Sequence, residues 1–152
     1  DSLNFGGDLP RYGAQVTEVL RRARRAVPDA SCLILGPLDR LERGPEGGLR
    51  SPSVVQRVAA AQRQAALAAG CAFWDSQAAM GGPGSMRDWL ARGLAIKDLV
   101  HLNARGSERF AERLEAALLA RLAAVSDVAP PGPAAPAFRR HWPGASPPSR
   151  CW

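Results

Sequence analysis

Apolar residues recur three or four positions apart in two long stretches of the chain, residues 10–27 and 104–125. This spacing predicts two amphipathic helices. In the first helix, arginines at positions 21, 22, 24 and 25 lie opposite the apolar residues and are interpreted as a solvated face. The buried stripe of the first helix is expected to contain Val16, Val19, Leu20, Ala23 and Val27. That of the last helix is expected to contain Phe110, Leu114, Ala117, Leu118 and Leu122.

Two short apolar runs, residues 31–35 and 71–75, lack helical spacing and predict buried strands. The order helix, strand, helix, strand predicts an α/β fold. We expect residues 31–35 and 71–73 to be parallel neighbours, with a right-handed crossover through the helix at 54–69. Two strands are too few for a covered parallel sheet. The sequence therefore predicts the C-terminal half of a larger three-layer α/β/α sandwich.

Residues that favour helix ends and loops lie between these elements. Ser51 is expected to cap the middle helix, with Pro52 in its first turn and Gly70 at its end. Residues 38–50 are rich in glycine and charge and are predicted to form a loop, long enough to suggest a functional role. Ser85 can cap a short helix that runs to Leu90.

The composition changes after residue 125, where Pro, Ala and Arg dominate. Residues 126–152 are predicted to form a disordered tail, which leaves residues 1–125 as the folded domain. Residues 1–4 contain no initiator Met and no signal pattern, so we expect either processing or a start within a longer gene product. The sequence consequently sets neither a localisation nor an oligomeric state.

The formal net charge of +6 at first suggests a nucleic-acid ligand. Almost every cation is arginine, with Lys97 the only lysine, and the arginines are spread along the whole chain. This distribution indicates a bias in composition, not a binding patch, so we expect no nucleic-acid partner. No apolar run reaches the length of a membrane span.

Three cysteines are present, at positions 32, 71 and 151. Their spacing fits no zinc motif. Cys32 and Cys71 lie within apolar runs and are interpreted as small core residues. We expect no disulfide, no metal and no cofactor.

The most informative segment for chemistry is residues 97–103, which contains Asp98 and His101. A carboxylate three residues before a histidine in a turn can bind one ring nitrogen and leave the other as a proton acceptor. A general base that deprotonates a serine requires this arrangement. Two structural alternatives remain: His101 as a partly buried structural residue, and Asp98 as an acceptor for turn amides.

The combined motifs resemble the SGNH/GDSL esterases, over about residues 1–122. Among these, the chain is most similar to enzymes that act on O-acetylated bacterial cell-wall glycans. The matching segments are residues 27–37 (VPDASCLILGP), 71–75 (CAFWD), 78–85 (AAMGGPGS), Trp89 and 98–102 (DLVHL).

The resemblance implies a flavodoxin-like sandwich and a serine esterase in which His101 is the base and Asp98 orients it. Of four family blocks, only the last, Asp-x-x-His, is found here. The serine block is absent, and the Gly-x-Asn block is expected just before Asp1. Ser2 follows no apolar strand and is rejected as the nucleophile. Asn103 and Ser107 depart from the threonine and tyrosine common in the family.

The resemblance implies hydrolysis of a small-molecule or glycan ester, and more specifically the removal of an acetyl group from a carbohydrate. Because the nucleophile block is lacking, the competing interpretation is a non-catalytic remnant or binding module. Met80 and Trp89 have two interpretations of equal weight, as residues that line the substrate cleft or as packing beneath the last loop.

Overall fold

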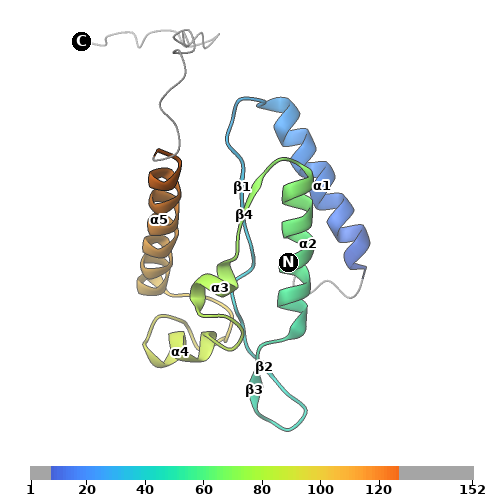
Figure 1. Ribbon diagram of the computed structural model, residues 1–152. Helices are drawn as coiled ribbons and strands as arrows, with labels where there is room; N and C mark the ends of the chain where they lie inside the picture. Colours follow the sequence, from blue (N-terminus) through green and yellow to red (C-terminus); the bar gives the residue numbers. More distant parts are fainter. Residues whose placement is uncertain (1–7, 127–152) are drawn as a thin grey trace, which may run out of the picture. The chain divides into compact units, whose positions relative to one another are not determined.

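A computed structural model describes residues 8–126 of the chain (Figure 1). The predicted tail lies outside the described residues, apart from Ser126 at the end of the last helix. One compact unit ends at Ala117 and a second begins at Leu118. The elements are α1 (Leu9–Ala26), β1 (Leu33–Leu35), β2 (Glu42–Arg43), β3 (Leu49–Arg50), α2 (Ser53–Ala68), β4 (Ala72–Trp74), α3 (Ser76–Met80), α4 (Met86–Ala91) and α5 (Ala104–Ser126).

The parallel strand pair predicted from the sequence is confirmed. β1 pairs with β4 in parallel, with Leu33 opposite Ala72 and Leu35 opposite Trp74. α2 is the crossover between the two strands, and both strands run toward the end of the molecule that carries α3 and the β2–β3 hairpin (Figure 1). The fold is α/β with a parallel sheet. The carboxyl ends of parallel strands are the usual location of a ligand site.

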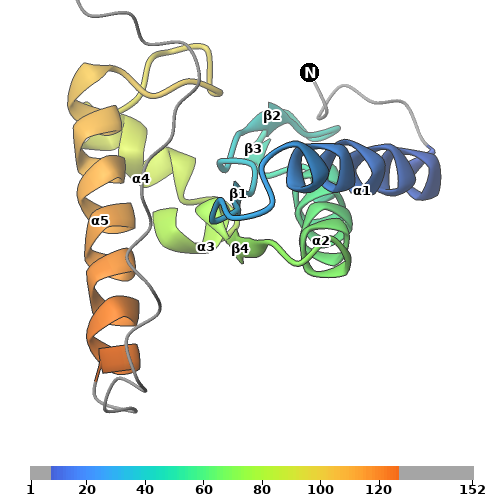
Figure 2. The same cartoon turned by 90° about the horizontal axis from the view of Figure 1, so that it is seen from above.

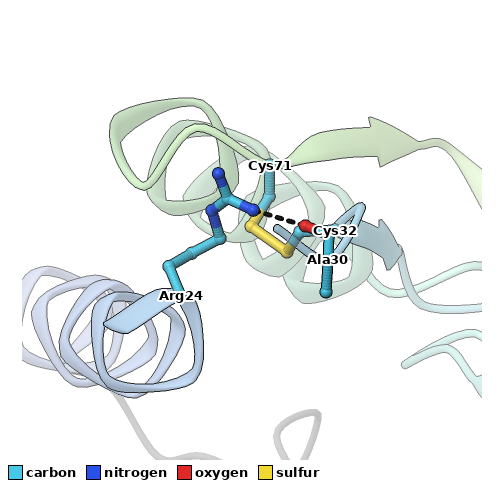
Figure 3. Close-up of a disulfide and its surroundings, with 4 residues drawn as sticks. All are labelled: Arg24, Ala30, Cys32 and Cys71. Carbon is cyan, nitrogen blue, oxygen red and sulfur yellow. Dashed lines mark hydrogen bonds between the residues drawn. A yellow bond between two sulfur atoms is a disulfide. The ribbon is translucent and has the colours of Figure 1, made fainter. Parts of the chain in front are cut away.

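Cys32 and Cys71 form a disulfide, so the expectation of two unlinked core cysteines was wrong (Figure 3). Each cysteine directly precedes its strand, and the register that places Leu33 opposite Ala72 also brings the cysteines together. Their Cα atoms are 4.7 Å apart, within the range that a disulfide can bridge. Arg24 of α1 donates to the carbonyl of Ala30 beside this bond.

Helices α1 and α2 lie side by side on one face of the strand pair (Figure 2). Leu20 of α1, Ala66 of α2 and the disulfide residue Cys71 form a buried cluster, against which Ile34 and Phe73 pack from the strands. Burial of this apolar surface stabilises the layer. None of the helices in the described part of the chain is both long and apolar enough to cross a membrane.

A second apolar cluster lies around the short helices. It consists of Leu41, Met80, Met86, Trp89 and Ala95, and Leu99, Leu102 and Phe110 are packed against it. The ring of Phe110, from α5, lies 5.1 Å from that of Trp74 at the end of β4. Contacts between tilted rings at this distance are favourable. This cluster therefore connects the strand ends to the segment that carries Asp98 and His101.

Two local predictions needed correction. The loop predicted at residues 38–50 contains an antiparallel hairpin, in which Glu42 of β2 pairs with Arg50 of β3. Strands of two residues are too short to show alternation in the sequence. Ser51 does not cap α2, since Pro52 occupies the cap position and the Ser51 hydroxyl donates to Asp39 instead.

Several residues predicted to be buried are exposed. Leu33 and Leu35 of β1 are 37% and 43% exposed. Among the described residues this sheet has only two strands, which leaves much of its surface uncovered. Val19 and Val27 of α1 are exposed too. Leu118 and Leu122 of α5 are also exposed. The prediction failed because helical periodicity identifies an apolar face but does not show whether another element covers it.

The second edge of β1 should make the isolated chain self-associate. Within residues 8–126, β1 pairs only with β4, so its other edge presents unpaired backbone groups beside exposed Leu33 and Leu35. We expect the weight-average mass in sedimentation to rise with concentration, and Leu35→Lys to reduce that rise. A mass that stays monomeric at all concentrations would contradict this expectation.

Candidate active site

Asp98 and His101 lie in the connection between α4 and α5. Ala95 and Leu102 form an isolated antiparallel bridge across the base of this loop. The amide of Ile96 donates to the carbonyl of His101 at 3.0 Å, which closes the turn. The bridge gives the turn a defined shape and places Asp98 and His101 at its tip.

The carboxylate of Asp98 binds the ring of His101. Asp98 Oδ2 lies 2.6 Å from His101 Nδ1, at the short end of the range expected for a base and its orienting acid. Asp98 Oδ1 accepts from the amides of Val100 and His101, both at 2.9 Å. Asp98 thus acts as the turn acceptor and also binds the imidazole. A proton on Nδ1 leaves Nε2 as the acceptor of the ring.

Hydrogen bonds hold the Asp98 carboxyl in its ionised form. The backbone amide of His101, then its side chain and the amide of Val100, lower the pKa of Asp98 from the ordinary 3.8 to about 2. The side chains remain accessible, with His101 72% and Asp98 40% exposed. Across the neutral range Asp98 is therefore an anion that favours the Nδ1–H form of His101.

The lowered pKa of Asp98 has a direct consequence for the turn at low pH. Stabilisation by the ionised carboxylate is complete above the ordinary pKa and is lost as the pH falls through about 2. We expect the 13C resonance of the Asp98 carboxyl to titrate near that value. In His101→Ala the titration midpoint of the Asp98 carboxyl should rise only part of the way toward the ordinary 3.8, because the backbone amides of residues 100 and 101 still donate to it. A midpoint near 4 in the unsubstituted chain would contradict this geometry.

The backbone inside the turn adopts an unusual conformation at Leu99. Its φ is 69°, and it is the only described non-glycine residue with a positive φ. Such a conformation costs an L-residue about 1–2 kcal/mol, so the surroundings must hold it. The carbonyl of Leu99 accepts from the amide of Leu41 at 2.9 Å, which joins the turn to the segment after β1.

The start of α5 fixes the other side of the turn. Asn103, which departs from the threonine expected from the resemblance, accepts from the amide of Gly106 at 3.0 Å and donates to the carbonyl of Gly93 at 2.9 Å. Asparagine and threonine are both helix-capping residues, so this departure preserves the cap. Gly106 approaches the loop so closely that a Cβ there would lie 1.8 Å from the Leu94 carbonyl oxygen. Only glycine fits at this position.

Met80 and Trp89 belong to the core, and of their two interpretations the packing beneath the last loop is confirmed. Both are buried, and the Trp89 indole donates to the carbonyl of Met80 at 2.9 Å. The guanidinium of Arg113 stacks 5.2 Å from the Trp89 ring. Ser2, which was rejected as a nucleophile, lies outside the described residues.

Sequence reasoning missed Asp39, whose carboxyl group is fully buried at the carboxyl end of β1. A polar residue just after a strand and Gly36-Pro37 is a recognisable signal for the ligand edge of a parallel sheet. Its presence in a charged, glycine-rich stretch concealed that signal. Among the described residues, no group of three potential metal ligands occurs.

Comparisons with known proteins support the α/β fold. The structure matches a solved structure described as "Peptidoglycan O-acetylesterase in action, 5 min", with a TM-score of 0.72 and 33% sequence identity. The match covers 81% of this chain and 35% of the other, so the chain spans about a third of that protein's length. No curated protein matches the chain.

The family assignment rests on most of the sequence. Residues 1–109 match the GDSL-like Lipase/Acylhydrolase family, and this span contains the parallel strand pair as well as Asp98 and His101. The similar solved structure shares the fold. The chain belongs to the GDSL-like lipase/acylhydrolase family.

Proposed function

We propose that this chain carries the general base of a serine ester hydrolase, with His101 as the base and Asp98 as the residue that orients it. The observation that carries the proposal is the 2.6 Å contact between Asp98 Oδ2 and His101 Nδ1. This contact favours the proton on Nδ1 and leaves Nε2 as the acceptor of the ring. The exposure of the imidazole leaves Nε2 accessible to a reacting hydroxyl.

In the proposed reaction, a serine Oγ attacks the acyl carbon of the ester while His101 Nε2 takes the hydroxyl proton. Collapse of the tetrahedral intermediate breaks the bond to the alcohol oxygen, which receives that proton from His101. A water molecule then attacks the acyl-serine, again losing its proton to Nε2. The second collapse releases the acid and returns the proton to serine.

The proposed substrate is an O-acetylated carbohydrate. Support comes from the similar solved structure, whose description names a peptidoglycan O-acetylesterase. At 33% identity and a TM-score of 0.72, the two chains share a fold. The acyl group removed would be acetate, and the product would be a sugar hydroxyl.

The nucleophile and the oxyanion donors are proposed to come from residues outside this chain. The chain corresponds to 35% of the length of its structural relative, which leaves room for the other family blocks elsewhere in a longer protein. We expect the gene to encode Gly-x-Asn immediately upstream of Asp1, and Gly-Asp-Ser farther upstream. An upstream sequence without these blocks would favour the alternative, a non-catalytic remnant or binding module.

The isolated chain is expected to lack specific esterase activity. A serine hydrolase needs its nucleophile, base and oxyanion donors in one preorganised site, and only the base and its orienting acid are identified here. The test is hydrolysis of an activated acetyl ester by residues 1–152, with His101→Ala and Ser2→Ala as variants. Turnover at ordinary enzymatic rates that Ser2→Ala abolishes would identify Ser2 as the nucleophile and overturn our assignment.

A further inference from the structure

Asp39 is buried at a point where four segments of the chain meet. Its side chain is 0% exposed. Oδ1 accepts from the Ser51 hydroxyl at 2.5 Å and from the Gln77 amide group at 2.8 Å, while Oδ2 accepts from the backbone amide of Met86 at 2.9 Å. Asp39 thus connects the segment after β1 to the segment before α2 and to helices α3 and α4.

A carboxyl group such as that of Asp39 is costly to bury unless its oxygens accept hydrogen bonds. The three donors come from positions that are 12, 38 and 47 residues away in the sequence. The backbone amide of Asp39 also donates to the sulfur of Met80 at 3.3 Å. The carboxyl group and the backbone together therefore fix the position of this residue against α3 and α4.

The segment that Asp39 fixes contacts the Asp98–His101 turn directly. Two residues after Asp39, the amide of Leu41 donates to the carbonyl of Leu99, the residue with the positive φ. The Leu41 side chain is buried in the cluster against which Leu99 packs. Both contacts hold the peptide that follows Asp98, and the amides of the next two residues orient the Asp98 carboxylate.

We propose that Asp39 is a positioning residue for the base of the hydrolase, which acts through the hydrogen bond from Leu41 to Leu99. Asp39 holds the segment after β1, Leu41 holds the strained peptide of Leu99, and that peptide keeps Asp98 against His101 Nδ1. This inference rests on the proposed function, because it takes His101 as the base that Asp39 positions. Asp39 itself would touch no substrate. The alternative is that Asp39 contributes only to the stability of the fold.

The experiment measures the tautomer of His101 and needs no ester substrate. The full chain is labelled with 15N-histidine in a His141→Gln background, so that the ring nitrogens of His101 alone are observed at a pH where the ring is neutral. The variants are Asp39→Ala and the milder Asp39→Asn, whose amide oxygen can keep part of the network. Leu20→Ala is the control, because it weakens the distant α1–α2 cluster.

Asp39→Ala should move the ring signals from the Nδ1–H form toward the Nε2–H form. Hydrogen exchange at the Leu41 amide should accelerate by about tenfold or more beyond any change in Leu20→Ala, as expected if one net hydrogen bond of roughly 1.4 kcal/mol is lost. Asp39→Asn should give an intermediate shift. If Asp39→Ala is too unstable to study, Asp39→Asn alone provides the test.

Ring signals and Leu41 exchange that match those of Leu20→Ala in every folded Asp39 variant would overturn the proposal. The readout is separate from the proposed function. A tautomer shift without esterase activity in the longer protein would refute hydrolysis but keep the positioning role of Asp39. Esterase activity without a tautomer shift in the Asp39 variants would support hydrolysis and refute the positioning role.

Discussion

Replacing His101 with alanine should reduce kcat/KM of the proposed complete esterase by roughly 10⁴-fold or more, since the proposed serine nucleophile then has no base to accept its proton. The measurement is hydrolysis of an activated acetyl ester by a polypeptide that joins this chain to the serine block. Asp98→Asn should cost less, roughly 10²–10³-fold, because Asp98 is partly exposed and water can replace some of its hydrogen bonding.

The chain offers matched controls for both substitutions. His141 is the other of its two histidines, and His141→Ala should leave the rate unchanged. Asp88, an exposed residue of α4, provides the same aspartate-to-asparagine change away from the turn. Wild-type activity in His101→Ala, or an equal loss in His141→Ala, would refute the assignment of the base.

Removing the disulfide should produce the largest loss of stability. In the chain-entropy account, a link between residues 39 positions apart stabilises the fold by about 4 kcal/mol, because it restricts the unfolded chain. We expect the double variant Cys32→Ala, Cys71→Ala to lose about 3–4 kcal/mol of unfolding free energy. For a domain of this size, that loss lowers Tm by roughly 10 °C.

Reduction provides the internal control for the disulfide. A thiol reductant should lower the Tm of the unsubstituted chain toward that of the double variant and leave the double variant unchanged. Peptide mapping without reductant should recover the peptides of Cys32 and Cys71 as one linked species. Two separate peptides, with equal melting temperatures for both proteins, would contradict the bond.

The sequence predicted the features that depend on local pattern. The parallel pairing of β1 and β4 follows from two short apolar runs separated by a helix of crossover length. The contact between Asp98 and His101 follows from a spacing of three residues within one turn. Both could be predicted because the residues involved are close in the sequence or belong to a repeated topological unit.

Features that depend on register or on distant contacts were not predictable in the same way. The disulfide requires the strand register that places Leu33 opposite Ala72, and composition alone does not contain that register. Asp39 resembles any charged loop residue until Ser51, Gln77 and Met86 are brought to it from other elements. These tertiary contacts give a residue its environment, and the environment determines its role.

The β2–β3 hairpin has a buried base and an exposed tip, which bears on how this protein could be engineered. Leu41 at the base is buried and donates to the carbonyl of Leu99 in the Asp98–His101 turn, whereas residues 45–48 at the tip are exposed. A Cβ at Gly48 would meet no neighbouring atom, whereas Gly47 has a φ of 80°, which favours glycine. Insertions at residues 45–48 should therefore leave the Asp98–His101 turn in place, so this tip is a position where a tag or a second domain could be added without disturbing the fold.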